Sequence, residues 1–412
     1  MLLKASFLLA LLPLLPAPAA AIPPPSPKGG EIRVSLLERV AHYNPQVAVF
    51  RDGGFVVVWN VGPSDFQGRF VIHARFFAQD GTPAGGELRL VDRSGYSQSV
   101  DQIVADRDGS FLVVWTEQES ADGKRSVFVR RFNRDGTPRG RRIQANVSHK
   151  SRRYHGVLAV GVDGRFAVAW SADVDLKPFY RSYTNSVARI FNAQGTPLTR
   201  EFIVGVGYPG IGDDNTYSEP AALGLGPDGS LTVQLQDLNL PDTYDNYLNR
   251  YDRKGKPKKH YALSEPLFCC VDTPGASLGM GKDGSLVAAW NGQWSVVMAQ
   301  RFAANGDPRG AKFRVSTEED FIQEDPCVAI ASGGTSVIVW MEKERDGDGG
   351  GIFGRAFSAD GTPLSNDFQI NTTSAGWQYQ PAIATAPGGP VVVVWVSYSS
   401  GTVFARLLTS GP

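Results

Sequence analysis

One phrase recurs along this chain, and it constrains the fold more than any other feature. Each copy has an alternating apolar strand, an Asp-Gly turn, an apolar run that ends in Trp, a variable loop, Arg-x-Phe, Gly-x-Pro and a short apolar strand. The anchors that end the apolar runs are Trp59, Trp115, Trp170, Leu235, Trp290, Trp340 and Trp395. These seven copies, numbered 1 to 7 below, indicate a repeat architecture rather than several unrelated domains.

The first copy divides into four predicted strands and no helix. Strand A is Gln46 to Phe50, strand B is Phe55 to Trp59, strand C runs from about Phe70 to Phe77, and strand D is Glu87 to Val91. β-Branched and aromatic residues fill these strands, and Asp-Gly suits the tight hairpins between them. A small sheet with two apolar faces must stack on its neighbours. The repeat therefore predicts an all-β, seven-bladed β-propeller of four-stranded antiparallel blades.

The ends of the chain predict how the propeller closes. The seventh copy stops after its strand C, Val403 to Leu408, and has no strand D. The missing strand is expected at the other end, because Pro27 to Val34 matches Pro83 to Leu90 of the first copy position by position. The N-terminal strand should complete the last blade and leave few exposed edges. We expect a Pro/Gly-rich lead-in over 22–30 and a single propeller over 31–412.

Residues 1–21 have the features of a secretory signal peptide. Lys4 is followed by the apolar run Ser6 to Leu15 and by small residues that give an A-x-A cleavage site at Ala19 to Ala21. No segment is long and apolar enough to span a bilayer as a helix. The sequence therefore predicts a secreted protein, periplasmic or extracellular, without a membrane span, and we expect a monomer.

The charge balance argues against one class of partner. The chain has 41 Lys and Arg against 41 Asp and Glu. Removal of the signal peptide with Lys4 leaves a net charge of minus one, whereas sequence-independent nucleic-acid binding needs a basic face. The run Lys254 to Lys259 falls in a tight turn and is interpreted as a solvated turn. No nucleic-acid partner is expected.

The recurrent Trp and Arg residues have structural explanations. Trp at one position of strand B is best explained by packing between blades. Arginine also recurs on strand C, where it could pair with acidic turn residues or lie over a Trp face. These arginines are Arg75, Arg130, Arg189, Arg355 and Arg406.

The segments Asp108 to Trp115 and Val127 to Asn146 resemble repeats that build propeller modules in large bacterial secreted and surface proteins. The resemblance covers nearly the whole mature chain and implies a fold rather than an activity. It extends distantly to integrin-type propellers, whose loops bind calcium. Only Arg345 to Gly349 approaches that calcium pattern, through Asp346 and Asp348. The turns do not match the Asp-box of sialidase propellers, so the resemblance does not imply a sialidase.

Standard catalytic spacings are absent from the sequence. It has no Gly-x-Ser-x-Gly elbow, no His-Glu-x-x-His, no phosphate-binding loop and no Cys-x-x-Cys. The histidines, His42, His73, His149, His155 and His260, are scattered among the copies, so zinc is not expected. We predict no cofactor and leave calcium open.

Long loops break the symmetry in copies 3 and 4. Propeller ligands usually bind on the face formed by the D-to-A and B-to-C loops, and three such loops are consecutive: 172–186, 206–218 and 237–246. They contain Phe179, Tyr180, Tyr183, Tyr208, Tyr217 and Tyr244, with Asp173, Asp175, Asp213, Asp214, Asp242 and Asp245. Aromatic rings beside carboxylates suit a sugar or a cationic peptide, although decorated loops without function are an equal alternative.

A second candidate site lies where strand A begins, at the mouth of the expected channel. Aligned on the Asp-Gly turns, the copies have Tyr43-Asn44, Ser99-Val100, Tyr154-His155, Glu219-Pro220, Pro274-Gly275, Glu324-Asp325 and Tyr379-Gln380. A converging ring of such groups could hold a small polar ligand or a metal. Wet channel mouths also tolerate polar residues without a function.

The cysteines allow one structural prediction. Cys269 and Cys270 lie in the loop that enters copy 5, and Cys327 begins strand A of copy 6. An exporting compartment permits a disulfide from Cys327 to Cys269 or Cys270.

Three functions remain open at this stage. The favoured hypothesis is a non-enzymatic module that recognises a glycan, peptide or partner protein on the loop face. The second is a polysaccharide hydrolase or lyase that uses Glu324, Asp325 and His155, because two carboxylates are the minimum for glycoside hydrolysis. The third is a structural spacer in a surface assembly.

Overall fold

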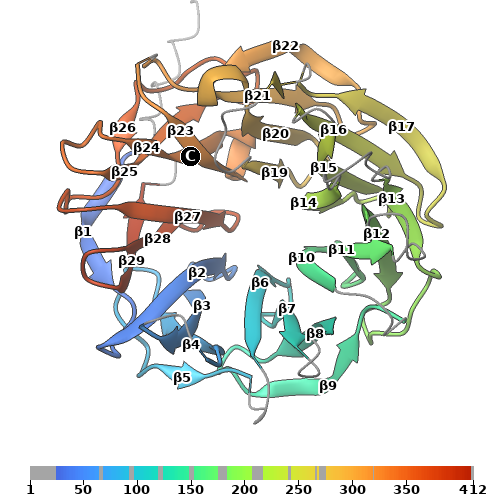
Figure 1. Ribbon diagram of the computed structural model, residues 1–412, viewed down its shortest axis with the longest axis horizontal. Coiled ribbons are helices and arrows are strands. Elements are labelled where there is room, and N and C mark those ends of the chain that lie inside the picture. Colours follow the sequence, from blue (N-terminus) through green and yellow to red (C-terminus); the bar gives the residue numbers. More distant parts are fainter. Residues whose placement is uncertain are drawn as a thin grey trace, which may run out of the picture.

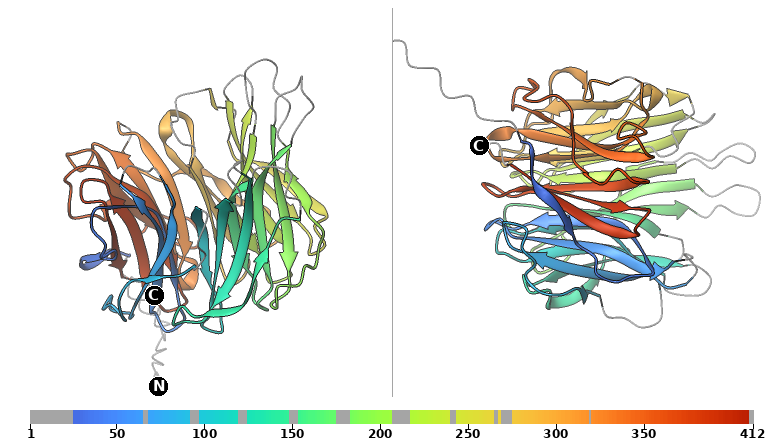
Figure 2. Two further views of the ribbon diagram at one scale, coloured as in Figure 1. Left: turned by 60° about the horizontal axis from the view of Figure 1, so that its bottom comes forward. Right: turned by 90° about the vertical axis from the view of Figure 1, so that its left-hand side faces the viewer.

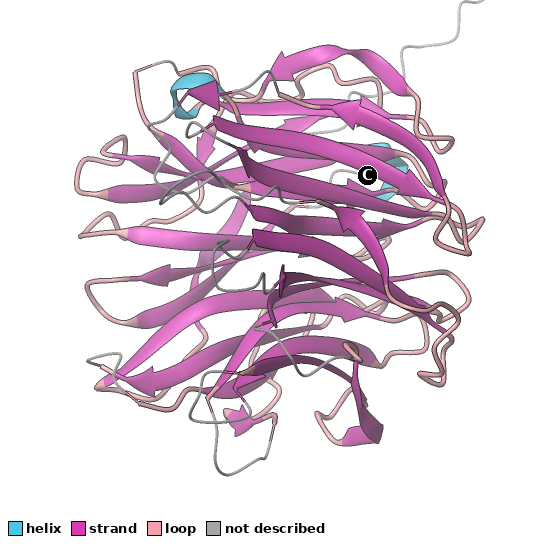
Figure 3. Ribbon diagram, turned by 45° about the vertical axis from the view of Figure 1, so that its right-hand side comes forward, coloured by secondary structure: helices cyan, strands magenta, loops and turns pink. Residues whose placement is uncertain are grey.

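Nearly all the regular secondary structure in the described part of the chain is β-strand. The computed structural model describes residues 25–64, 68–91, 97–118, 124–147, 153–174, 183–206, 217–239, 243–264, 267–268, 275–318 and 320–409. Two short 3₁₀ turns, η1 (Gln293–Ser295) and η2 (Ser332–Gly334), interrupt the strands (Figure 3). Within these residues no helix is long and apolar enough to cross a membrane.

The strands follow the repeat, copy by copy. They are β1 (Pro27–Arg33), β2 (Val40–Val49), β3 (Phe55–Pro63), β4 (Val71–Phe77), β5 (Leu88–Arg89), β6 (Gln98–Ala105), β7 (Phe111–Gln118), β8 (Arg125–Phe132), β9 (Pro138–Gln144), β10 (Arg153–Val160), β11 (Phe166–Val174), β12 (Tyr183–Phe191), β13 (Phe202–Gly205), β14 (Tyr217–Leu225), β15 (Leu231–Asn239), β16 (Thr243–Tyr251), β17 (Pro257–Ala262), β18 (Leu267–Phe268), β19 (Ala276–Met280), β20 (Leu286–Asn291), β21 (Val297–Phe302), β22 (Pro308–Arg314), β23 (Gln323–Ile330), β24 (Ser336–Lys343), β25 (Gly350–Phe357), β26 (Phe368–Gln369), β27 (Gln378–Thr385), β28 (Val391–Ser397) and β29 (Thr402–Leu408). In copy 1, strand A is longer than predicted and strand D is shorter.

The strands form five four-stranded sheets and one nine-stranded sheet. Four of the four-stranded sheets are copies 1, 2, 5 and 6, and the fifth combines the three strands of copy 7 with β1. Neighbouring strands in these sheets are antiparallel. The nine-stranded sheet contains copies 3 and 4, which one parallel pairing of Thr184 with Tyr217 joins. That pairing is a single residue pair near the first residues of β12 and β14, and the antiparallel order within each copy is unchanged.

The sheets are arranged around a central opening as in a β-propeller (Figure 1). The first strand of each copy packs beside the first strand of the next in the order β2, β6, β10, β14, β19, β23 and β27, and β27 packs on β2. The connections between the strands divide between two faces. We call the side with the D-to-A and B-to-C connections the loop face, and the side with the A-to-B and C-to-D turns the turn face. Figure 2 shows the two faces from the edge.

The N-terminal strand lies where its sequence match predicted. β1 pairs antiparallel with β29, with Ile32 opposite Ala405 and Arg33 opposite Phe404. Pro27 lies opposite Leu408, just as Pro83 bridges Phe77 in copy 1. β1 therefore begins within the segment 22–30 that we predicted to be a lead-in, because Pro27 and Lys28 already pair with the last strand.

The apolar core lies between successive copies. All six anchor Trp side chains are buried, which confirms that they pack in the core. The buried apolar residues form seven clusters, and each cluster combines side chains of two successive copies. One of them joins Val57 and Trp59 of copy 1 to Val394 and Ala405 of copy 7.

The recurrent strand C arginines differ from the prediction. Arg75, Arg189 and Arg355 each lie over the phenylalanine two residues later, rather than over a Trp. Their Nη1 atoms donate to backbone carbonyls at the end of the preceding copy. The acceptors are Val34 at 3.1 Å, Ala145 at 3.2 Å and Val315 at 2.9 Å, respectively. These arginines therefore tie neighbouring copies together through charge-assisted hydrogen bonds.

Candidate functional site

A β-bulge lies in strand A at most of the predicted mouth positions. In copies 1, 3, 6 and 7 the pairing with strand B shifts directly after the first residue of the predicted pair. The second residue then adopts a positive φ: 51° for Asn44, 54° for His155, 51° for Asp325 and 53° for Gln380. A non-glycine residue in this region costs about 1–3 kcal/mol, and such strain is common at binding sites. Bulges also redirect side chains.

Copies 2 and 4 bulge differently. Their register shifts between Val100 and Gln102 and between Pro220 and Ala222. A β-branched Val and a proline both resist positive φ, so the extra residue falls one position later. In copy 2 that extra residue is Asp101. The alignment of the copies did not include Asp101 among the mouth residues.

Side-chain hydrogen bonds connect neighbouring copies around the mouth. The backbone N–H of Asn44 donates to Gln380 Oε1 at 2.7 Å, and the side-chain amide of Asn44 donates to the Val100 carbonyl. The backbone N–H of Leu158 donates to Gln102 Oε1 at 2.6 Å. These hydrogen bonds link copies 7, 1, 2 and 3 in turn. Asn44 and Gln380 therefore have a structural role between copies.

Three carboxyl groups at the mouth have raised pKa values. Burial raises the pKa of Asp101 to about 6, although Thr116 Oγ1 donates to it at 2.7 Å. Burial also raises the pKa of Glu219, and the His155 ring counteracts the shift at both Asp101 and Glu219. Burial and the neighbouring Glu324 raise the pKa of Asp325 to about 6. The mouth therefore stabilises a positively charged or hydrogen-bond-donating group when these carboxyls ionise.

Glu324, a predicted mouth residue, is paired within the protein. Its carboxylate is buried and forms an ion pair with Lys343, with Nζ at 2.8 Å. The structure records no contact between Glu324 and His155, which belong to copies 6 and 3. The Asp325 side chain has no hydrogen bond or ion pair with the residues described, and its backbone carbonyl accepts a hydrogen bond from the Cys327 thiol at 3.6 Å.

Exposed aromatic side chains lie near the Glu324–Lys343 ion pair. Trp377 is 41% exposed and Tyr398 is 67% exposed, and the backbone N–H of Tyr398 donates to the Trp377 carbonyl at 2.8 Å. Lys343 Nζ lies 6.0 Å from the Trp377 ring centroid, and the Tyr379 and Tyr398 rings are 6.2 Å apart. Large exposed aromatic residues often mark interaction sites. We call Glu324, Asp325, Lys343, Trp377, Tyr379 and Tyr398 the mouth cluster.

Sequence reasoning missed Trp377 and Tyr398. A signal existed for Trp377, since six of the eight Trp residues are repeat anchors and only Trp294 and Trp377 lie outside the repeat position. Trp294 is 90% exposed, with φ of 60° in η1. Like Trp377, it lies on the loop face.

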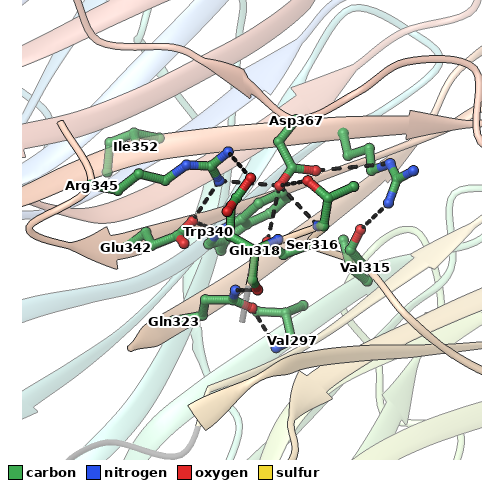
Figure 4. Close-up of polar contacts among 12 residues, drawn as sticks. Val297, Val315, Ser316, Glu318, Gln323, Trp340, Glu342, Arg345, Ile352 and Asp367 are labelled. Atoms are coloured by element: carbon green, nitrogen blue, oxygen red, sulfur yellow. Dashed lines mark hydrogen bonds and ion pairs between the residues drawn. The ribbon is translucent and has the colours of Figure 1, made fainter. Parts of the chain in front are cut away.

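A buried ionic network supports the loop beside the mouth cluster (Figure 4). Arg345 donates to Glu342 Oε2 at 3.0 Å and to Asp367 Oδ2 at 3.1 Å, and Glu318 Oε1 lies 3.6 Å away. Trp340 Nε1 also donates to Glu342 at 2.8 Å. These bonds fix the connection between β24 and β25, which follows Lys343 directly.

The weak calcium candidates lie in this same connection. Asp346 Oδ2 accepts a hydrogen bond from Asn371 Nδ2 at 3.0 Å, and Asp348 Oδ2 accepts one from the Gly376 N–H at 3.1 Å. Within the described ranges, no group of three or more His, Cys, Asp or Glu side chains is arranged to hold a metal ion. Calcium binding stays a prediction.

Much of the predicted site in copies 3 and 4 lies outside the described residues. This applies to Phe179, Tyr180, Tyr208, Asp175, Asp213, Asp214 and Asp242. Tyr154, Tyr183 and Tyr244 are described as backbone positions in β10, β12 and β16. Tyr217 is half-buried in β14, and Asp237 lies opposite Asp245. Burial and the charge of Asp245 raise the pKa of Asp237 to about 7.

Two further predicted residues have structural partners. Tyr43 packs edge-on against Phe70 with 4.9 Å between the ring centroids, and burial raises its pKa to about 12. Cys327 forms no disulfide with a described residue, and its Sγ lies 3.0 Å from the Pro381 carbonyl oxygen. Cys269 and Cys270 lie outside the described residues, so their predicted disulfide with Cys327 stays untested.

The channel beneath the mouth is lined mainly by apolar side chains of strand A. One cavity there has a volume of about 420 Å³ and is lined by residues such as Val49, Ile103, Leu278, Ile330 and Ile383, with Asp101 and Gln46 at its polar end.

Among the solved structures reported below, the first supports a shared overall fold and nothing more. No family model and no curated protein matches the sequence. A solved structure of a protein of unknown function from Dyadobacter fermentans is 14% identical and has a TM-score of 0.51, covering 95% of this chain and 100% of that one. The β-propeller domain of the Trilobed protease from Pyrococcus furiosus is 8% identical with a TM-score of 0.48, covering 92% and 97%. A NanB sialidase from Streptococcus pneumoniae is 11% identical with a TM-score of 0.47, covering 97% and 70%.

Proposed function

We propose that this protein is an exported binding module that recognises a glycan through the mouth cluster on its loop face. The exposed Trp377 and Tyr398 rings near the Glu324–Lys343 ion pair carry the proposal, and the carboxyl of Asp325 follows Glu324 in the same bulge. An aromatic face stacks on the C–H groups of a sugar ring, and a nearby carboxylate accepts bonds from its hydroxyls. A peptide with a basic side chain is the competing ligand for the same groups.

The proposal includes a closed ring of seven blades from β1 to β29, residues 27–408, with the short pairing between Thr184 and Tyr217 as a contact between two blades. The packing of β27 on β2 and the pairing of β1 with β29 support closure. In a closed ring the seven strand A segments surround one channel, so the loops of all blades border a single mouth.

Rigidity of the mouth cluster supports binding over a passive surface. Lys343 lies between Glu324 and the Trp377 ring, and Arg345 anchors the next residues through two buried carboxylates. A preorganised site loses less conformational entropy when a ligand binds. A structural spacer would not require exposed aromatic rings held in this way.

Glycan-array screening followed by calorimetry tests this function. For the best ligand, Trp377→Ala and Tyr398→Ala should each weaken binding by about tenfold or more, since stacked aromatic residues are typical hot spots. The matched control is Leu198→Ala, because Leu198 is 50% exposed and lies on the outer rim of copy 3. Unchanged glycan affinity in both aromatic variants would overturn the proposal, and preferential binding of basic peptides would reassign the ligand.

An enzymatic alternative has one observation in its favour. Asp325 and Glu324 are adjacent carboxyls in different environments, since Glu324 is paired with Lys343 and burial raises the pKa of Asp325 to about 6. Enzymes separate an acid from a base in this way. Turnover of a bound polysaccharide that is lost in Glu324→Gln or Asp325→Asn would establish this alternative, and intact ligand after prolonged incubation would exclude it.

A further inference from the structure

A groove with excess positive charge lies on the turn face, opposite the mouth cluster. One cavity of about 670 Å³ occupies the turn-face end of the channel, and a second of about 610 Å³ extends outward between copies 2 and 3. Both are lined by Asp106, Arg107 and Val162, so they form one continuous depression from the channel to the rim. We call this depression the arginine groove.

The lining of the arginine groove is unbalanced in charge. Its cations are Arg107, Arg130, Arg131, Arg139, Arg141, Lys282, Arg301 and Arg309, and its carboxylates are Asp106, Asp108, Asp163 and Asp283. The groove therefore carries twice as many cations as carboxylates, whereas the whole chain has equal numbers. The local excess favours an anionic ligand.

Some of these arginines have structural partners. Arg131 pairs with Asp106 and donates to Ser110 Oγ at 2.9 Å and to the Gly164 carbonyl at 3.2 Å. Arg139 pairs with Asp108 at 2.6 Å. These bonds hold together the turn of copy 2, its outer strand and the adjacent turn of copy 3.

Other cations of the groove have no such partner. Arg107, Arg141 and Lys282 are exposed, and their side chains make no hydrogen bond or ion pair with the residues that the structure describes. Arg107 lies at the junction of the two cavities, Arg141 in the outer one and Lys282 in the inner one. The paired arginines thus shape the groove, and the three unpaired cations are spaced along it.

We propose that the arginine groove binds an acidic oligosaccharide, a chain of sugar rings with carboxylate or sulfate groups. The guanidinium fork matches both oxyanions. Cations spaced along an open groove suit a chain with charges at intervals better than a single ion. The lining of the outer cavity includes four small residues, Gly140, Gly164, Ala193 and Gly195, so a sugar ring can approach the backbone there. Val162, where the two cavities meet, is 41% exposed.

Calorimetry with two acidic probes tests this site, oligogalacturonate for carboxylate and a heparin-derived oligosaccharide for sulfate. Binding of either should weaken between about 50 and 200 mM salt, because the contacts are ionic. The double variant Arg107→Gln/Arg141→Gln should raise the dissociation constant by about tenfold or more, since each change removes a hydrogen bond to a charged group. Neutral maltohexaose should not bind in this groove.

Arg51→Gln is the matched control. Arg51 precedes the Asp-Gly turn of copy 1 as Arg107 does in copy 2, and it is exposed but lines neither cavity. It should leave affinity within about twofold. The proposal fails if neither probe binds at low salt, if Arg51→Gln and the double variant have equal effects, or if polyglutamate binds as tightly as both oligosaccharides. Trp377→Ala should not change this binding, which separates the test from that of the loop face.

Discussion

Replacement of Arg345 by Met tests whether the buried ionic network holds the loop face in place. The Met side chain keeps much of the aliphatic packing but removes the guanidinium, which lies over the Phe353 ring at 4.5 Å. Arg345 is 17% exposed, whereas its acceptors Glu342 and Asp367 are 0% and 1% exposed. The substitution therefore leaves Glu342 without its cation, and Asp367 with Arg355 alone at 3.9 Å.

The expected cost of Arg345→Met follows from that imbalance. Removing one partner of a buried ion pair costs about 3–5 kcal/mol of unfolding free energy, because the remaining charge stays desolvated. This is a large part of the roughly 5–15 kcal/mol that stabilises a typical domain. Urea unfolding followed by tryptophan fluorescence measures it, and Trp340, which donates to Glu342, reports locally.

The pH dependence gives a second, independent readout. Burial raises the pKa of Glu342 above its ordinary value, and Arg345 opposes that shift. A carboxyl whose folded-state pKa exceeds its unfolded value stabilises the fold at low pH and loses that contribution as pH rises through the folded pKa. Without Arg345 the pKa rises further. The loss of unfolding free energy in Arg345→Met should therefore be largest near about pH 8 and become smaller toward about pH 5.

A double-mutant cycle identifies the cause. Glu342→Gln in the Arg345→Met background should restore about 1–3 kcal/mol of the lost unfolding free energy, because it removes one orphaned charge. A cost below about 1 kcal/mol for Arg345→Met, or a further loss on adding Glu342→Gln, would refute the reasoning.

Three more predictions concern other parts of the fold. Deletion of residues 25–34 should lower the melting temperature and broaden the calorimetric transition. The deletion exposes the edge of β29 and removes the Arg33 and Val34 carbonyls to which Arg75 donates. An unchanged transition would contradict this prediction. Asp101→Asn should raise the unfolding free energy by about 1–2 kcal/mol near about pH 8 and have little effect near about pH 4. The reason is that the pKa of Asp101, about 6 in the folded protein, exceeds its value in the unfolded chain. Equal effects at both pH values in urea titrations would contradict this prediction. Burial raises the pKa of the Cys327 thiol to about 12, so the thiol should react slowly with iodoacetamide in the folded protein. In a Cys269→Ser/Cys270→Ser background at neutral pH, labelling should be at least about 100-fold slower in the folded than in the unfolded protein. Equal labelling rates would contradict this prediction.

The sequence by itself determined the features that are local or repeated. The apolar run before each Trp anchor specifies a buried central strand, because a strand with apolar residues on both faces must be covered on both sides. The match between Pro27 to Val34 and Pro83 to Leu90 identified the partner of β29, since the prolines begin corresponding pairings with the preceding strand. Periodicity and repetition carry this information without knowledge of distant contacts.

Only the tertiary structure decided which polar and aromatic groups meet. Trp377 and Tyr398 come from different connections of the chain and lie together because a backbone hydrogen bond joins them. Asp101 enters the mouth because Val100 resists the positive φ that its equivalents adopt, which moves the extra residue of the bulge by one position. The arginine groove depends on which cations find partners across two copies. The packing between blades determines such contacts. Contacts between residues far apart in the sequence produce no periodic pattern from which they could be predicted.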